Sequence, residues 1–221
     1  MGKLVKLSLK DRLVAELSRK ILNGELAPGS RVIEQELADE YGVSRSVVRE
    51  TLVVLELQGL IISTPYTGTE VASISRNEVE GLLLPIRVDV EQFALKEGLK
   101  RFDSDVFDAF SVVLADMERA VDGGDIEAFN IADIRFHELI VDSCDSVTAR
   151  SIWDSIHQRI RMHFALQTGR TGALTSFLED HRRLVDTFRT GDLDSSLAAL
   201  KAHILDTNSP HLDVLGAERA E

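Results

Sequence analysis

The chain has 221 residues, 44% of them hydrophobic, and a formal net charge of −12. This length predicts one large or two modest domains with enough apolar side chains for a core. The one cysteine, Cys144, excludes an internal disulfide and is typical of a reducing, cytoplasmic setting. Since no stretch reaches about 18 unbroken apolar residues, we expect neither a signal peptide nor a membrane span.

The negative charge is unevenly distributed along the chain. Residues 1–75 carry 9 basic and 10 acidic side chains, whereas residues 76–221 carry 16 and 27. The acidity therefore belongs to the second part, and the nearly neutral first part can still present a local basic face. Because that part is not strongly basic, an argument for nucleic-acid binding must rest on geometry.

A first helix is predicted over residues 8–23, and Asn23-Gly24 ends it. Its apolar residues recur at helical spacing: Leu9, Leu13, Leu17 and Ile21. A turn over residues 26–30 follows, because Pro28-Gly29 interrupts any regular pattern there.

Two shorter helices and a hairpin complete the first part. One helix spans 34–41 and ends at a glycine, and the next is capped by Ser44 and runs to about Gln58. Strands over 60–64 and 70–72 flank a Pro- and Gly-containing turn. This order predicts a winged helix-turn-helix.

From Arg76 onward the pattern is helical throughout. The predicted helices span 76–100, 103–122, 125–143, 147–167, 173–190 and 193–208. Pro85 is expected to kink or restart the first of them. The fold class is therefore mainly α, with a winged helix-turn-helix domain over 1–75 and an all-α helical bundle over 76–221.

The helix that Ser44 caps carries two arginines at its N-terminal end. Arg45 and Arg49 lie about 40° apart on its surface, with Ser46 nearby. The opposite face is apolar and is expected to be buried: Val48, Leu52 and Leu55. The exposed end suits a recognition helix, since guanidinium groups bind guanine edges and phosphates. The alternative is that both arginines are ordinary solvated charges.

Four polar side chains of the second part fall on apolar helix faces. Asp133 and His137 share the face of Phe129 and Phe136, and the other two are His181 and His203. Buried polar groups are costly unless they are paired. A single metal ion would satisfy all four, and neutral imidazoles suit zinc or nickel. The alternative is hydrogen bonding, with Asp133 and His137 paired and the other histidines bonded to backbone.

The segment "NGELAPGSRVIEQELADEYGVSRSVVRETLVVLELQGLI" and the following hairpin resemble the DNA-binding domain of the GntR family of bacterial transcription regulators. The resemblance covers residues 8–72. It implies a homodimer that acts in the cytoplasm, binds operator DNA and does not bind a membrane. The implied DNA-binding residues are Gln35, Ser44, Arg45, Ser46, Arg49 and, at the wing tip, Thr67 and Gly68. The wing tip "PYTGT" departs from the family pattern in lacking a basic residue.

The segments "DIRFHELI", "LEDHRRLV" and "LKAHILDT" resemble the ligand-bearing segments of the FCD effector domain, found in the FadR branch of that family. The resemblance implies that a divalent transition metal, zinc before nickel, is bound by Asp133, His137, His181 and His203. It also implies a pocket beside the metal for a small carboxylate effector.

Three further residues are assigned to that pocket. "PIRVDVEQFAL" resembles the segment that carries a family arginine near the pocket, here Arg87, and a buried arginine suits a carboxylate. The alternative for Arg87 is a salt bridge with Glu91 at the rim. His163 and Gln167 share a face with apolar residues and are expected to line the cavity, or else to lie on a partly buried helix edge.

The sequence therefore predicts a ligand-responsive bacterial transcription regulator, a repressor that a small organic acid releases from a pseudo-palindromic operator. The rival interpretation is a metal-dependent hydrolase or lyase attached to a DNA-binding module, since catalytic metals keep an open position. Against it stands the lack of an unpaired general base near the motifs. A third possibility is a regulator whose metal is purely structural.

Overall fold

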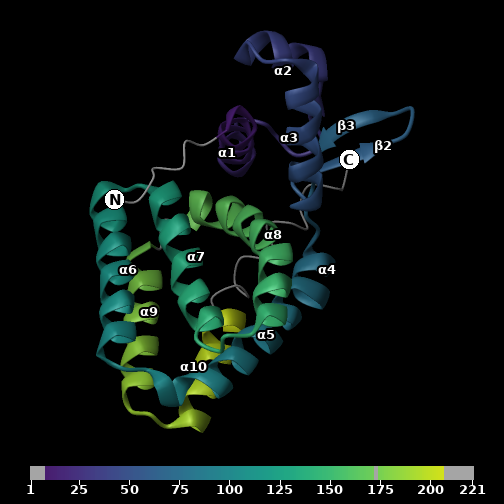
Figure 1. The fold of residues 1–221 in the computed structure, drawn as a ribbon. Helices are drawn as coiled ribbons and strands as arrows, with labels where there is room; N and C mark the ends of the chain where they lie inside the picture. Colours follow the sequence, from purple (N-terminus) through teal and green to yellow (C-terminus); the bar gives the residue numbers. More distant parts are fainter. Residues whose placement is uncertain (1–7, 172–173, 207–221) are drawn as a thin grey trace, which may run out of the picture. The chain divides into compact units, whose positions relative to one another are not determined.

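The computed structural model describes residues 8–171 and 174–206, without the side chains of 164–171 and 206 (Figure 1). The chain divides into two compact units, Met1–Ser73 and Ile74–Glu221, which are described separately. Among the described residues, every helix is too short or too polar to cross a membrane.

The first unit contains three helices. They are α1 (Leu9–Leu22), α2 (Glu34–Tyr41) and α3 (Arg45–Leu57), close to the predicted ranges. Ser8 begins α1 with a reciprocal capping box to Asp11, and the Ser44 hydroxyl accepts a bond from the N–H of Val47 at the start of α3. The turn between α2 and α3 requires Gly42, whose φ of 62° lies in the left-handed region.

A small antiparallel sheet forms the wing. β2 (Ile61–Thr64) and β3 (Gly68–Val71) make the predicted hairpin, which Figure 1 shows projecting sideways from α3. A third strand, β1 (Arg31–Val32), pairs with β3 on its other edge, so the order is β1-β3-β2. Two residues are too few to show the alternation that marks a strand, so the sequence did not predict β1.

The core of the first unit lies between α1 and α3. Val48, Leu52 and Leu55 are buried, as their common helix face predicted. On α1 the buried face begins at Leu13, whereas Leu9 is 54% exposed.

The second unit is helical. Its elements are α4 (Arg76–Glu78), a π-helical turn (Val79–Leu83), α5 (Leu84–Gly98), a 3-10 turn (Leu99–Arg101), α6 (Ser104–Gly123), α7 (Ile126–Asp142), α8 (Val147–Thr171), α9 (Leu174–Arg189) and α10 (Leu193–Asp206). α8 continues four residues past its predicted end, and the predicted terminal residues 173 and 208 lie outside the described part.

Pro85 explains why the first predicted helix is divided. A proline inside a helix removes one N–H donor, and its ring meets the carbonyl four residues earlier. The chain widens into the π-helical turn over Val79–Leu83 and starts α5 with Pro85 in its first turn, where no donor is needed. The expected restart at Pro85 is confirmed.

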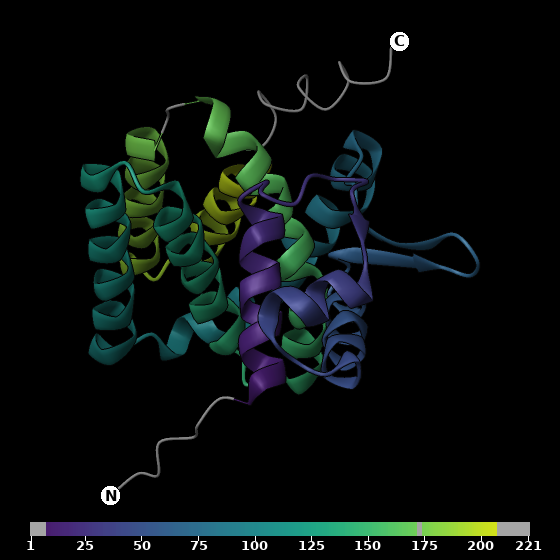
Figure 2. The same cartoon turned by 90° about the horizontal axis from the view of Figure 1, so that it is seen from above.

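The helices of the second unit form a bundle. α6, α7 and α9 run side by side, α5 contacts α7, and α10 contacts both α5 and α9 (Figures 1 and 2). Aromatic rings from α6, α7 and α9 meet in its core, with Phe110 at 4.9 Å from Phe136 and 6.1 Å from Phe188 between ring centroids. This arrangement directs the inner faces of α7, α9 and α10 toward one another.

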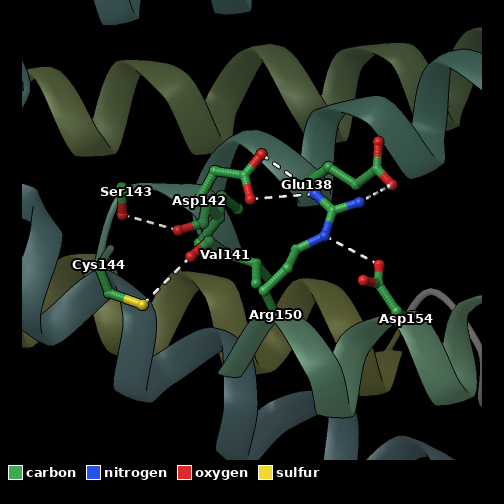
Figure 3. Close-up of polar contacts among 8 residues, drawn as sticks. Glu138, Val141, Asp142, Ser143, Cys144, Arg150 and Asp154 are labelled. Atoms are coloured by element: carbon green, nitrogen blue, oxygen red, sulfur yellow. Dashed lines mark hydrogen bonds and ion pairs between the residues drawn. The ribbon is translucent and has the colours of Figure 1, made fainter. Parts of the chain in front are cut away.

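The end of α7 is tied to the beginning of α8 by Arg150 (Figure 3). Its guanidinium donates to Asp142 at 3.0 Å, to Glu138 at 3.2 Å and to Asp154 at 2.9 Å. A single exposed ion pair stabilises little, but this one guanidinium binds three carboxylates from two helices. The network therefore helps to fix α7, the helix that carries two of the predicted metal ligands.

Candidate functional site

The N-terminal end of α3 presents the two predicted recognition arginines to solvent. The side chains of Arg45 and Arg49 are 58% and 61% exposed. Both approach Glu34 at the start of α2: Arg49 Nε donates to its oxygens at 2.9 and 3.1 Å, and Arg45 Nη2 lies 3.6 Å away. The arginines are thus accessible but held by a carboxylate that the sequence interpretation did not include.

The other predicted DNA-binding residues are also exposed. Gln35 donates to Asp39 at 2.9 Å, and the hydroxyls of Ser44 and Ser46 lie 2.8 Å apart. At the wing tip Thr67 and Gly68 are exposed, and Gly68 has a φ of 111° that favours glycine. Gln35 follows Glu34, the residue that contacts both arginines, in the first turn of α2, but its own side chain bonds Asp39. Among the described residues, no hydrogen bond or ion pair joins these residues to the wing tip.

Three histidines from different helices meet inside the second unit. His137 of α7, His181 of α9 and His203 of α10 offer nitrogen atoms that all lie within 4.8 Å of one another. The Nε2 atoms of His137 and His203 are 3.4 Å apart, and the ring centroids of His181 and His203 are 4.4 Å apart. These residues were predicted to share one site, and the fold brings their rings together.

Asp133 lies at the edge of this histidine cluster. Its Oδ1 is 3.0 Å from His181 Nε2, although neither that nitrogen nor Asp133 Oδ2 has a well-aligned hydrogen-bond partner among the described residues. Asp133 is not within the 4.8 Å group that the three histidines form. The hydrogen bond between Asp133 and His137 that was considered as the alternative to a metal is not among the hydrogen bonds of the described residues, since His137 Nδ1 faces Glu91 and Asp133 faces His181.

Two hydrogen bonds set the proton positions on the imidazoles. His181 Nδ1 lies 2.7 Å from the carbonyl oxygen of Phe177, and His137 Nδ1 lies 2.6 Å from Glu91 Oε2. A carbonyl or carboxylate oxygen accepts, so each Nδ1 must donate its N–H. In a neutral ring the lone pair is then on Nε2, which faces the centre of the cluster.

Electrostatics favour the metal-binding forms of His137, His203 and Asp133. Burial lowers the pKa of His137 and, together with the neighbouring histidines, holds the pKa of His203 well below its usual value. Burial raises the pKa of Asp133, but the contact with His181 and the electrostatic effect of neighbouring groups, Arg87 among them, outweigh burial, so this pKa falls to about 2. Neutral imidazoles and an ionised carboxylate are the forms that bind metals.

The donor set fits a metal ion. Two imidazole nitrogens bound to a tetrahedral zinc at about 2.0–2.1 Å each would lie about 3.3 Å apart, and those of His137 and His203 are 3.4 Å apart. A cation would also offset the repulsion between the His181 lone pair and the Asp133 carboxylate, and it would give Asp133 Oδ2 a partner.

Arg87 and His163, predicted to line an effector pocket, are both buried, with exposures of 1% and 2%. Arg87 Nε donates to Glu91 at 2.7 Å. This is the salt bridge considered as the alternative, but it lies in the interior and not at a rim. His163 is more buried than a partly buried helix edge would be, and the side chain of Gln167 lies outside the described part.

A cavity of about 350 Å3 opens between α9 and α10. It is lined by Asp180, Arg183, Leu184, Thr187, Ala199, Ala202 and His203. His203 thus belongs both to the histidine cluster and to the lining of this cavity, so the cavity borders the cluster.

Sequence reasoning missed two acidic residues at these sites. Glu91 appeared only as a possible rim partner of Arg87, although it is fully buried and bonds His137. Its position was a usable signal, since Val88, Ala94 and Leu95 of the same helix are buried as well. Glu34 had no such signal, because its partner lies on another helix.

The comparisons with known proteins agree with both halves of this description. Residues 9–71 match the family described as bacterial regulatory proteins, gntR family, and residues 82–206 match the FCD domain. Together these matches span most of the chain. The chain belongs to the GntR family of transcription regulators and carries an FCD domain.

Among its relatives are two repressors. The gluconate operon transcriptional repressor of Bacillus licheniformis is 28% identical over 86% of this chain and 79% of its own length. The galactonate operon transcriptional repressor of Escherichia coli K12 is 28% identical over 86% and 91%. The family and these relatives favour a regulator over a hydrolase or lyase.

A solved structure shows the same fold. A putative GntR transcriptional regulator from Rhodococcus sp. RHA1 superposes with a TM-score of 0.79 at 22% identity, covering 96% of this chain and all of the other. FCD domains bind metals, and the cluster of His137, His181 and His203 gives this chain residues that can hold one.

Proposed function

We propose that this protein is a homodimeric repressor that a small organic acid, bound beside a zinc ion in residues 76–221, releases from operator DNA. The observation that carries the proposal is the convergence of His137, His181 and His203 beside a buried Asp133. Such a cluster inside an FCD domain, joined to an exposed pair of recognition arginines, gives one chain both a sensor and a DNA-binding head.

The DNA-binding half rests on Arg45 and Arg49. Their guanidinium groups project from the N-terminal end of α3, which enters the major groove in helix-turn-helix proteins. Gln35, Ser44 and Ser46 lie at the same end, and Thr67 and Gly68 extend from the wing toward the adjacent groove. A twofold dimer would read a pseudo-palindrome in the bacterial cytoplasm, where operator DNA is found.

Zinc is the proposed metal because three histidines and one aspartate match its preference for nitrogen and oxygen ligands. Nickel also binds imidazoles and is the second choice. In this arrangement Asp133, His137, His181 and His203 hold the ion. A bound zinc accepts further oxygen ligands, and this supplies the attraction for a carboxylate.

The proposed effector is a small carboxylate. The region from residue 76 onward holds 16 basic and 27 acidic side chains, so an anion needs a local cation there. The metal provides one, and Arg87 and His163 are buried in the same unit. That two relatives repress the gluconate and galactonate operons, which concern sugar acids, supports a carboxylate effector.

Two measurements test this function. Elemental analysis of untagged protein should give about one zinc or nickel ion per chain. If the protein is purified without metal and its melting temperature does not change when zinc or nickel is added, the metal site is contradicted. Calorimetric titration of the acid into free and operator-bound protein should then show weaker binding to the complex. By linkage, an acid that lowers the affinity of the protein for DNA by some factor must itself bind the DNA-bound protein more weakly than the free protein, by that same factor.

The hydrolase or lyase interpretation predicts turnover. A panel of hydroxy acids and esters incubated with metal-loaded protein should remain unconverted if the site is a sensor. Sustained turnover that disappears in His137→Ala would favour the enzyme.

A further inference from the structure

One carboxylate joins the predicted effector arginine to the predicted metal site. Glu91 has no exposed surface, and its two oxygens are divided between two partners. Oε1 accepts a bond from Arg87 Nε at 2.7 Å, and Oε2 lies 2.6 Å from His137 Nδ1. α5 supplies Arg87 and Glu91 one turn apart, whereas His137 comes from α7.

The charges in this chain of contacts are balanced. Glu91 faces a donor with each oxygen: the Arg87 guanidinium at 2.7 Å and ring nitrogen Nδ1 of His137 at 2.6 Å. An isolated buried carboxylate is strongly unfavourable, and here the Arg87 guanidinium neutralises it. Glu91 can therefore accept the His137 Nδ1–H without requiring a protonated imidazole.

The same contact fixes which nitrogen of His137 is available. With Nδ1–H donated to Glu91, the ring is held with its Nε2 lone pair toward His203 and His181. Histidines that bind metals usually donate the other N–H to a carboxylate or carbonyl, which orients the ring and raises its basicity. His181 has the carbonyl version of this arrangement, through Phe177.

We propose that Glu91 is a positioning residue that orients His137 for metal binding and fixes Arg87 in the same interior. This inference rests on the proposed metal site and adds a residue to it. Glu91 touches neither the metal nor the effector in this role; it acts through His137 and Arg87. One side chain thereby sets the geometry of both the metal-binding and the acid-binding groups.

The first test is metal affinity, measured by competition of cobalt or zinc against a chromophoric chelator. Glu91→Gln keeps the size of the side chain and should weaken affinity about 10- to 100-fold, as loss of such supporting contacts does elsewhere. The cobalt absorption bands should also change, since they report ligand geometry. Glu118→Gln is the matched control, because it removes the carboxylate of an exposed ion pair with Arg182 in the same unit.

Glu91→Gln leaves Arg87 buried without its anion, so a second variant guards against misfolding. The double variant Arg87→Met/Glu91→Gln removes both charges while keeping similar volumes. Circular dichroism of the metal-free proteins establishes folding. Weakened metal binding in a folded variant supports the inference, and wild-type affinity in both variants overturns it.

A measurement on the wild type needs no variant to fold. Nitrogen-15 NMR of the metal-free protein should show His137 as the Nδ1–H tautomer, and an Nε2–H tautomer would overturn the inference. These outcomes differ from a failure of the proposed function, in which the wild-type protein itself binds neither zinc nor cobalt.

Discussion

Glu34, the first residue of α2, holds Arg49 of α3 through both carboxylate oxygens, at 3.1 and 2.9 Å from Nε. Arg45 approaches the same carboxylate at 3.6 Å. The two guanidinium groups that we propose as DNA contacts are therefore held in place before DNA arrives, and in that role each would exchange this anion for a base edge or a phosphate. Ordering reduces the conformational entropy lost on binding, whereas the exchange reduces affinity.

Replacing Glu34 by Gln should raise affinity for nonspecific DNA and lower discrimination between operator and nonspecific duplex. The reason is that a negative charge near the phosphates is removed and the arginines lose a fixed orientation. The change should stay below about tenfold, because exposed ion pairs contribute at most about 1 kcal/mol. Fluorescence anisotropy with both duplexes at fixed salt measures it, with Glu118→Gln as control. Unchanged affinity for both duplexes would show that Glu34 has no part in recognition.

Replacing Arg45 or Arg49 by Ala should weaken operator binding by about 1–3 kcal/mol if each makes a bidentate base contact. The fold should be unaffected, since both side chains are more than half exposed. Gel shifts at fixed salt give the affinities, and thermal unfolding checks the fold. Arg119→Ala, which removes an exposed arginine from the second unit, is the charge-matched control. Wild-type affinity in both arginine variants would exclude this end of α3 as the DNA contact.

Replacing His203 by Ala should weaken both metal and acid binding. His203 supplies one of the three clustered nitrogens and also lines the cavity between α9 and α10. Loss of one nitrogen ligand leaves the metal held by fewer groups, so it should be lost during dialysis that the wild-type complex survives. Elemental analysis and calorimetry provide the measurements. Thr187 lines the same cavity but contributes no nitrogen to the cluster, so the control variant Thr187→Ala should retain the metal.

Lowering the pH should destabilise the metal-free protein. The pKa values of His137 and His203 are lowered in the folded state, while unfolded histidines have a pKa near 6.5. Below about pH 6.5 the unfolded chain binds more protons than the folded one, so the free energy of unfolding falls with pH. Asp133, with a pKa of about 2 in place of 3.8, stabilises the fold above pH 3.8, and that contribution is lost as the pH falls toward 2.

The melting temperature of metal-free protein between pH 8 and pH 5 tests this pH dependence. A decrease over that interval is expected, and His203→Gln should flatten it. A melting temperature that rises as the pH falls would mean that the histidines are stabilised as imidazolium ions, and that the hydrogen-bonded alternative to a metal site is correct.

Replacing Gly98 by Ala should destabilise the second unit by about 1–3 kcal/mol, the usual cost of overpacking a close contact. An added Cβ at this end of α5 would collide with Ser143 Oγ and lie 2.8 Å from the Ser143 carbonyl oxygen at the end of α7. Gly123→Ala is the matched control, because an added Cβ there meets nothing within 4 Å. Chemical denaturation of both variants measures the difference. Equal stability would show that α5 and α7 are less closely packed than the structure indicates.

The local elements of this fold were largely predictable. Helix boundaries follow from apolar spacing and from capping residues such as Ser44, and burial of Val48, Leu52 and Leu55 follows from one helix face. The restart at Pro85 follows from covalent geometry. The two-residue strand β1 was not predictable, because it exists only through its pairing with β3.

The candidate metal site was partly predictable. The sequence placed each histidine on the apolar face of its own helix, since a period of 3.6 residues assigns a residue to a face. It could not place those faces around one point, which depends on how α10 contacts α5 and α9. The four expected ligands are therefore not equivalent: the three histidines share a common centre, and Asp133 approaches through His181.

The sequence by itself determined the two-part organisation, the helices, and the residue types at both sites. Only the tertiary structure decided which residues from different helices pair with one another within each site. Glu34 and Arg49 are 15 residues apart, Glu91 and His137 are 46 apart, and His137 and His203 are 66 apart. Periodicity and capping act over a few residues, whereas these contacts depend on the angles and distances at which helices pack, which the whole core sets.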